Sequence, residues 1–130
     1  MKRILVAGSS PYAPILEFSR AVRVGNFIAV GGTAPIDRQG KTACPGDPGG
    51  QARRCLEIIR SALSEAGGAL EDVIRTRTLL TRIEDWEAVA RVRAEYFKGI
   101  RPVDTVLEVS RFINPEWLVE IEVDAIVGDR

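Results

Sequence analysis

The chain has 130 residues, the size of one domain, and its 18 basic residues balance its 18 acidic residues. A net charge of zero provides no field that would attract nucleic acid or an anionic membrane, so we expect neither partner. Histidine is absent, which excludes Ser-His-Asp and Cys-His catalysis and histidine metal ligands. The two cysteines, Cys44 and Cys55, are too few and too awkwardly spaced for a zinc site. We therefore expect one domain over residues 1–130, with no metal and no cofactor.

The sequence also predicts where the protein resides. No apolar run approaches the roughly 18 residues that a membrane-spanning helix needs. The first residues lack the apolar segment of a secretory signal. A reducing cytoplasm with free thiols is the location we expect.

The first third of the chain predicts three short strands. Residues 1–7 read as a strand that ends at a Gly-Ser-Ser-Pro turn, and residues 18–24 and 27–30 read as a hairpin around Gly25-Asn26. Gly31 and Gly32 follow at the end of the third strand, where paired glycines indicate unusual torsions or the close approach of another group. Residues 37–50 form a loop rich in glycine and proline.

Two helices are predicted in the remainder. Asp47 and Pro48 have the residue types of an N-cap and a first helical position, and apolar residues then recur every three or four positions until Gly67. A second helix is expected over residues 84–98, with Trp86 as a core anchor on its apolar face. Strands are expected over residues 72–81, 104–110 and 118–127.

The order β-β-β-α-β-α-β-β favours an α+β fold in which two helices cover one face of a mixed sheet. The last strand alternates, so that Glu120, Glu122 and Asp124 share one side of it. Arg75 and Arg77 have the same parity on another strand and are natural cross-strand partners. We favour such a structural role over catalysis for Glu122 and Asp124.

Several segments together resemble the Rid superfamily, the RidA/YjgF group of imine and enamine deaminases once called L-PSP endoribonucleases. The segments that carry this resemblance are residues 102–109 (PVDTVLEV) and 119–122 (VEIE), with further similarity over residues 21–28, 31–35, 51–68 and 70–74. The resemblance covers almost the whole chain. It implies a chorismate-mutase-like subunit that forms a homotrimer, with a small-molecule cleft at each subunit interface.

The resemblance also implies the site residues. Glu120 matches the family glutamate that positions the attacking water, and Asp104 occupies the position of the arginine that grips the substrate carboxylate. Phe18 and Gly31 stand where deaminating members carry a tyrosine and commonly a serine. The candidate catalytic residues are thus Glu120 and Asp104, and the candidate ligand-binding residues are Phe18, Gly31, Gly32, Thr33, Thr105, Val106 and Arg111.

An aspartate at position 104 changes the expected substrate. A bidentate arginine supplies two hydrogen bonds worth about 1.5–3 kcal/mol each, and a carboxylate in its place adds repulsion. Together these effects weaken the binding of a 2-imino acid by more than about 100-fold. Simple 2-imino acids are therefore not expected as substrates unless another arginine, such as Arg20 or Arg111, reaches the cleft.

Two interpretations of Asp104 and several functions remain open. Asp104 either caps its strand or pairs with a nearby arginine, which we favour, or forms an acidic cleft with Glu120 that holds an amine or shares a proton. The first function is hydrolysis or deamination of a small amine- or imine-containing metabolite. The alternative is a non-catalytic metabolite-binding trimer with a regulatory or chaperone-like role. Neutral charge and the absence of histidine argue against ribonuclease activity.

Overall fold

The central strand β6 (Val119–Ile126) alternates between buried apolar and half-buried acidic side chains, and this alternation defines two faces of the molecule. Its apolar residues from Val119 to Ala125 are at most 1 % exposed and pack beneath helix α2 (Pro48–Glu65). Its acidic residues point to the opposite side of the sheet. These features come from a computed structural model that describes residues 2–129, so Met1, with which the first expected strand begins, lies outside the described residues.

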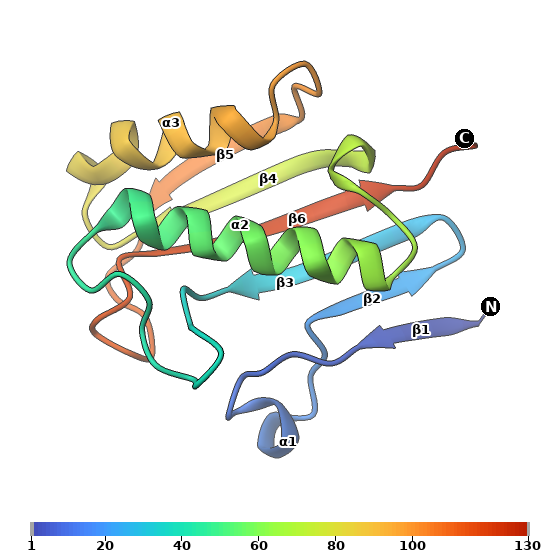
Figure 1. Cartoon of the computed structure of the whole chain (residues 1–130), viewed down its shortest axis with the longest axis horizontal. Coiled ribbons are helices and arrows are strands. Elements are labelled where there is room, and N and C mark those ends of the chain that lie inside the picture. Colours follow the sequence, from blue (N-terminus) through green and yellow to red (C-terminus); the bar gives the residue numbers. More distant parts are fainter. Residues whose placement is uncertain (1, 130) are drawn as a thin grey trace.

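Six strands form one mixed sheet in the order β1-β2-β3-β6-β4-β5 (Figure 1). The pair β4 and β5 is parallel, and the other neighbouring pairs are antiparallel. The remaining strands are β1 (Arg3–Val6), β2 (Ala21–Val24), β3 (Phe27–Thr33), β4 (Val73–Leu80) and β5 (Val103–Glu108).

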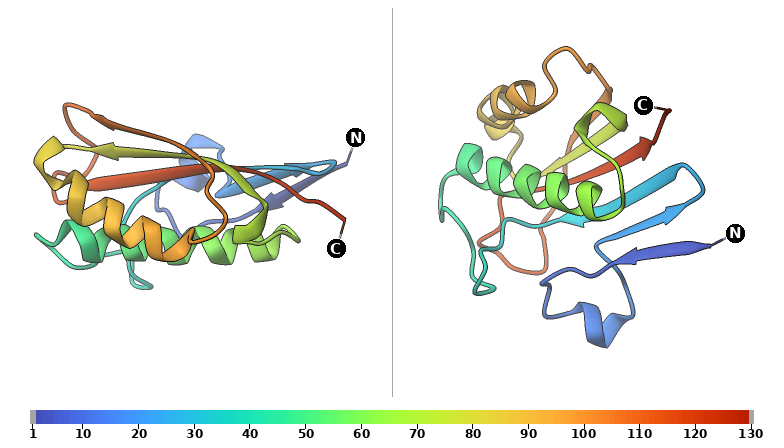
Figure 2. Two further views of the ribbon diagram at one scale, coloured as in Figure 1. Left: turned by 90° about the horizontal axis from the view of Figure 1, so that it is seen from above. Right: turned by 45° about the vertical axis from the view of Figure 1, so that its right-hand side comes forward.

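Helices α2 and α3 (Trp86–Tyr96) lie side by side on one face of the sheet, and the other face is open (Figures 1 and 2). Helix α2 begins where its sequence predicts, because the Asp47 side chain accepts a hydrogen bond from the Gly50 N–H at 3.0 Å. The apolar stripe of this helix is buried against the sheet. The α+β architecture with two helices on one face of a mixed sheet is therefore confirmed.

The expectation that Trp86 anchors the core is wrong. Its side chain is 49 % exposed, because Trp86 is the first residue of α3 and follows the short 3-10 turn η2 (Ile83–Asp85). Val89 and Val92, further along α3, are buried and make the core contacts of this helix. The opening turn of α3 thus lies outside the core.

The segment before the first hairpin also differs from its prediction. Residues 18–20 do not belong to a strand, because β2 begins at Ala21. A short helix, α1 (Ala13–Leu16), precedes them and ends at Glu17, whose φ of 60° turns the chain back toward the sheet. Strand β3 is longer than expected and reaches Thr33, and a second 3-10 turn, η1 (Leu70–Asp72), leads into β4.

The open face of the sheet carries exposed apolar side chains on strands β1, β3, β5 and β6. Their positions alternate with the residues that face the helices, and the three acidic residues of β6 lie on the same face. Within residues 2–129, no helix has the length and apolar character to cross a membrane. The exposed apolar residues of the open face are Leu5, Phe27, Val103, Leu107 and Ile126.

Candidate functional site

A pocket of about 150 Å³ lies where the end of β3 meets the start of β6 and the segment around α1. The first half of the chain supplies one wall through the loop and helix before β2. The other wall comes from the β5–β6 connection and from β6 itself. Six residues that matter for its chemistry are Tyr12, Phe18, Arg20, Gly32, Trp117 and Glu120.

The close approach of β3 to Glu120 depends on a glycine. The register between β3 and β6 shifts between Val30 and Thr33, so Gly31 and Gly32 lie in an irregular part of the ladder. A Cβ atom placed on Gly32 would be 2.8 Å from Oε1 of Glu120, closer than real Cβ contacts come. The glycine pair that the sequence marks as a close approach therefore makes room, at position 32, for the carboxylate.

Glu120 has the properties of a proton-transfer group. Burial raises the pKa of its carboxyl, Arg20 opposes that rise, and Glu122 adds to it. Among residues 2–129, no side chain or backbone N–H lies within hydrogen-bonding or ion-pairing distance of this carboxylate. A carboxyl group beside a pocket can accept and donate a proton, and a raised pKa moves the pH range of this exchange upward from that of a free carboxyl.

Arg20 is the cation of the pocket, and it is only 9 % exposed. Its Nη1 group donates to the carbonyl oxygens of Gly31 at 3.3 Å and Gly32 at 2.8 Å, and to Oγ1 of Thr33 at 3.1 Å. Burial lowers the pKa of Arg20, and the nearby Glu120 raises it. Arg20 thus fixes the end of β3 and provides positive charge close to Glu120.

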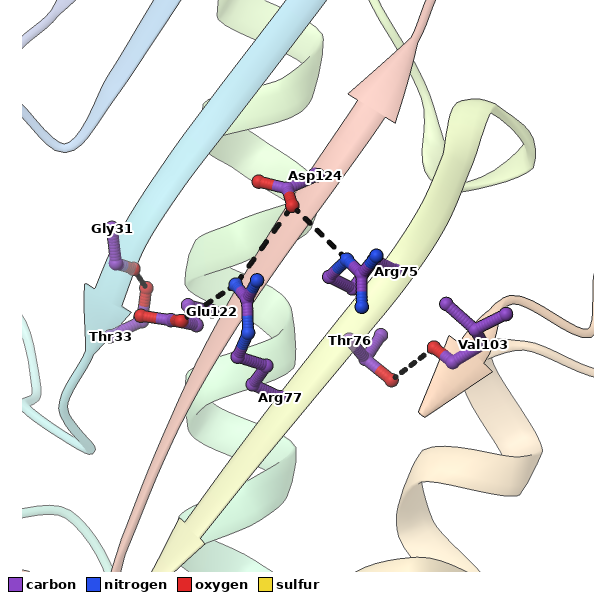
Figure 3. Close-up of polar contacts among 8 residues, drawn as sticks. All are labelled: Gly31, Thr33, Arg75, Thr76, Arg77, Val103, Glu122 and Asp124. Carbon is purple, nitrogen blue, oxygen red and sulfur yellow. Dashed lines mark hydrogen bonds and ion pairs between the residues drawn. The ribbon is translucent and has the colours of Figure 1, made fainter. Parts of the chain in front are cut away.

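The other two acidic residues of β6 are held by arginines, as the sequence predicts. Nη1 of Arg77 is 2.9 Å from Oε1 of Glu122 and 3.9 Å from Oδ2 of Asp124, and Nε of Arg75 is 3.6 Å from that same Oδ2. Figure 3 shows this network on the face of the sheet that points away from α2. Glu122 and Asp124 are therefore structural, and of the three β6 acids Glu120 alone lines the pocket.

Asp104 is paired with an arginine of α3. Its Oδ1 accepts a hydrogen bond from Thr76 at 2.8 Å and lies 3.4 Å from Nε of Arg93, which also donates to Thr76. This cluster is on the helix-covered face of the sheet, whereas Glu120 belongs to the opposite face. Within one chain the acidic cleft of Asp104 and Glu120 does not form, and the interpretation of Asp104 as an arginine's partner describes the structure.

The pocket unites some of the expected ligand-binding residues and leaves others apart. Phe18 and Gly32 line it, whereas Gly31 and Thr33 contribute oxygen atoms that hold Arg20 in place. Three more lie elsewhere in the chain and line no part of this pocket: Thr105 and Val106 on β5, and the exposed Arg111 in the β5–β6 connection.

Sequence reasoning missed the aromatic walls of the pocket. Tyr12 directly follows the predicted turn of residues 8–11, and Trp117 directly precedes the strand predicted over residues 118–127, so neither was singled out. Trp117 is 9 % exposed, and its Nε1–H has no acceptor within the described chain. Within residues 2–129, no group of three His, Cys, Asp or Glu side chains is arranged to hold a metal ion.

Comparison of the sequence and the structure with known proteins shows which family this chain resembles. The family model for endoribonuclease L-PSP matches residues 8–127. A RutC family protein of Pyrococcus abyssi is 36% identical over 121 residues, which are 93% of this chain and 94% of that protein. A crystal structure of a YjgF/YER057c/UK114 family member from Mycobacterium tuberculosis has 40% identity and a TM-score of 0.88, covering 97% of this chain and 100% of that one.

A more distant structure shares the same fold. The crystal structure of a putative endoribonuclease from Thermotoga maritima is 27% identical, with a TM-score of 0.85, and covers 99% of this chain and all of that one. The similarity therefore extends across the whole sheet and both long helices, including β3 and β6, which carry Gly32 and Glu120.

Proposed function

The chain belongs to the endoribonuclease L-PSP family, also called the Rid superfamily, and from this premise we propose that it hydrolyses a small imine-containing metabolite in the pocket lined by Glu120. One observation carries the proposal. The Glu120 carboxylate is unpaired within the described chain, its pKa is raised by burial, and it lies beside a pocket. A carboxylate kept only for structure would be expected to have a partner, as Glu122 and Asp124 have.

One proton-carrying group, the Glu120 carboxyl, suffices for the proposed reaction. Ionised Glu120 takes a proton from a water molecule as the water oxygen adds to the carbon of the protonated imine, and the C=N electron pair moves to nitrogen to give a neutral carbinolamine. Glu120 then gives that proton to the amine nitrogen, the C–N bond breaks with release of ammonia, and the hydroxyl proton passes back to the Glu120 carboxylate as the carbonyl group forms. The overall reaction consumes one water per imine and needs no cofactor. Trp117 supports the proposal of a polar ligand because this residue lines the pocket and its buried N–H is a donor without an acceptor in the described chain.

The substrate is proposed to lack the carboxylate of a simple 2-imino acid. By the resemblance, Asp104 stands at the position of the arginine that holds the substrate carboxylate. Because Asp104 is paired with Arg93, the loss of that arginine weakens the binding of a carboxylate more than repulsion by Asp104 does. Arg20 does line the pocket, but its Nη1 is occupied by three oxygen atoms of β3. Loss of even one hydrogen bond to a charged group costs about 1.5–3 kcal/mol, which weakens binding by at least about tenfold.

We also propose that the chain forms a homotrimer that completes the site. The open sheet face exposes Leu5, Phe27, Val103, Leu107 and Ile126 on either side of the charged side chains of β4 and β6, and several large exposed apolar residues on one face favour an interaction site. The pocket within one chain is small beside the roughly 300–1,000 Å³ of typical ligand sites. Light scattering is expected to give a mass of three times 14.2 kDa, and Leu107→Asp is expected to reduce it. A monomeric native protein would overturn the trimer.

The test of the function compares two matched imines. Ammonia release is measured above the buffer rate for 2-iminobutyrate, generated in situ, and for the corresponding 2-imino amide, which has no carboxylate. We expect the native protein to accelerate hydrolysis of the amide at least about tenfold more than that of the acid, and Glu120→Gln to abolish both. Asp104 lies on the opposite face of its own sheet from Glu120, so Asp104→Arg is expected to gain activity on the acid only where a neighbouring subunit of the proposed trimer brings residue 104 to the pocket.

Two results would overturn parts of this proposal. Full activity in Glu120→Gln would remove Glu120 from catalysis. Equal acceleration of the acid and the amide by the native protein would show that another cation, with Arg20 the nearest candidate, holds the carboxylate.

A second function, a non-catalytic metabolite-binding trimer, is favoured by the apolar character of the pocket walls. Phe18 and Gly31 carry no hydroxyl where the deaminating relatives have a tyrosine and commonly a serine. This function predicts ligands that raise the Tm of the native protein and of Glu120→Gln alike, without ammonia release.

A further inference from the structure

We propose a second binding site, for a small oxyanion such as phosphate or a carboxylate, in a pocket of about 390 Å³ between helix α2 and the segment that follows β1. We call it the outer pocket. It is distinct from the pocket of Glu120, and the proposal does not depend on any activity there. Besides Gly8, the polar and charged residues that line it are Ser9, Arg20, Arg38, Arg54, Glu57, Ser61 and Glu65.

Arg20 turns an unused edge toward the outer pocket. Its Nη1 is held by β3, but its Nε and Nη2 have no acceptor among residues 2–129, although the side chain is only 9 % exposed. A Cβ built on Gly8 would lie 3.3 Å from Nε and 3.7 Å from Nη2, so this free edge adjoins Gly8, which lines the outer pocket. The Nε–Nη2 edge of a guanidinium is a fork that binds carboxylate or phosphate with two hydrogen bonds.

Two further arginines line the same pocket. Nε of Arg54 donates to the Ile36 carbonyl at 2.6 Å, which fixes the side chain and leaves its two terminal NH₂ groups without an acceptor in the described chain. Arg38 is exposed and has no hydrogen bond or ion pair with any of residues 2–129. Three guanidinium groups around one cavity in a protein of zero net charge make a local excess of positive charge that favours an anion.

The two acidic residues at the pocket offset this charge only in part. The Glu57 carboxylate is 3.2 Å from Nη1 of Arg60 and also accepts a hydrogen bond from Tyr96, so it already has two partners. Glu65 is exposed at the end of α2. The hydroxyl groups of Ser9 and Ser61 add neutral donors, as is common where proteins bind phosphate.

Binding of inorganic phosphate and of acetate to the native protein tests the site by NMR titration at constant ionic strength. We expect saturable shifts of the Arg20 and Arg54 Nε–H signals. Arg38→Gln and Arg54→Gln are each expected to weaken binding by roughly tenfold, because each removes hydrogen bonds to a charged ligand. Arg82→Gln is the matched control, since Arg82 is exposed and lines neither pocket.

The outcomes distinguish a phosphate site from a carboxylate site, and they also show whether the proposal is wrong. Tighter binding of phosphate than of acetate assigns the site to phosphorylated ligands, and the reverse order assigns it to carboxylates. Arg38 is exposed and has no hydrogen bond or ion pair within the described chain, so its variant is expected to fold even if Arg54→Gln does not. The proposal is wrong if neither anion gives a saturable shift, or if Arg38→Gln and Arg82→Gln bind the anion as the native protein does.

Discussion

The Glu120 carboxylate lies over the bare backbone of Gly32, in space that any side chain at position 32 would enter. An added Cβ would be 2.8 Å from Oε1 of Glu120. The atom it meets is the end of a flexible side chain, so the fold can adjust while the carboxylate moves. Gly32 is therefore a determinant of where Glu120 lies, and the neighbouring Gly31 is not.

The first prediction uses this pair of glycines. Gly32→Ala is expected to displace Glu120 and lower ammonia release at least about tenfold, because proton transfer requires hydrogen-bonding distance. Gly31→Ala is the matched control, since its Cβ would meet only the Arg20 carbonyl oxygen at 3.8 Å, an ordinary contact. Steady-state kinetics and urea unfolding of both variants provide the check. Equal activity in the two variants would show that the position of Glu120 does not matter.

The second prediction concerns pH. Burial raises the pKa of Glu120 in the folded protein, so the folded state binds a proton that the unfolded state releases first. Protonated Glu120 therefore contributes to the free energy of unfolding in full at pH values below the pKa that it has in the unfolded state. This contribution declines as the pH rises through the higher pKa of the folded state. Glu120→Gln is expected to match the native protein at low pH and to be the more stable of the two at neutral pH. Urea unfolding at several pH values measures the difference, and a constant gap across pH would contradict it.

The third prediction concerns Asp104 and Arg93, whose Oδ1 and Nε are 3.4 Å apart and whose side chains are 28 % and 16 % exposed. Asp104→Arg removes a partly buried ion pair and places two guanidinium groups together, which is expected to lower the free energy of unfolding by about 1–3 kcal/mol. Adding Arg93→Asp restores opposite charges and is expected to recover much of the loss. If Asp104→Arg is as stable as the native protein, the pair contributes nothing measurable. If it proves too unstable to assay, the charge-swapped variant replaces it in the imine test.

The fourth prediction separates the two thiols. Cys55 is fully buried against the sheet and burial raises its pKa strongly, whereas Cys44 is exposed in the loop before α2. A maleimide reagent is expected to add once to the native protein, at Cys44, and twice after unfolding, because only the accessible thiolate reacts. Mass spectrometry of peptides identifies the site. Labelling of Cys55 in the native state would show that α2 opens from the sheet.

The sequence predicts features that depend on local pattern. Asp47 caps α2 because capping requires only a few neighbouring residues, and Arg75 and Arg77 meet Glu122 and Asp124 because strand parity is readable from alternation. The error at Trp86 has a physical reason, since helical spacing does not reveal which residues of an apolar stripe reach the core.

Other features could not be predicted from the sequence, because they are too short to show a pattern or because they depend on contacts between distant segments. Helix α1 rests on a single turn of backbone hydrogen bonds, too short for any periodicity to indicate. To predict that Asp104 pairs with Arg93, one would need to know where α3 lies over β5. To predict that Arg20 lines two pockets, one would need to know the register of β2 with β3. The resemblance located Glu120, but only the structure shows which groups surround it.

The placement of the two tryptophans gives the protein an internal optical probe. Trp86 is half exposed on α3, and Trp117 is buried in the wall of the pocket that contains Glu120. In Trp86→Phe all of the indole emission would come from Trp117, in a less polar environment. A ligand that enters the pocket would then change the wavelength or intensity of that emission, so candidate metabolites can be screened by fluorescence before any reaction is known.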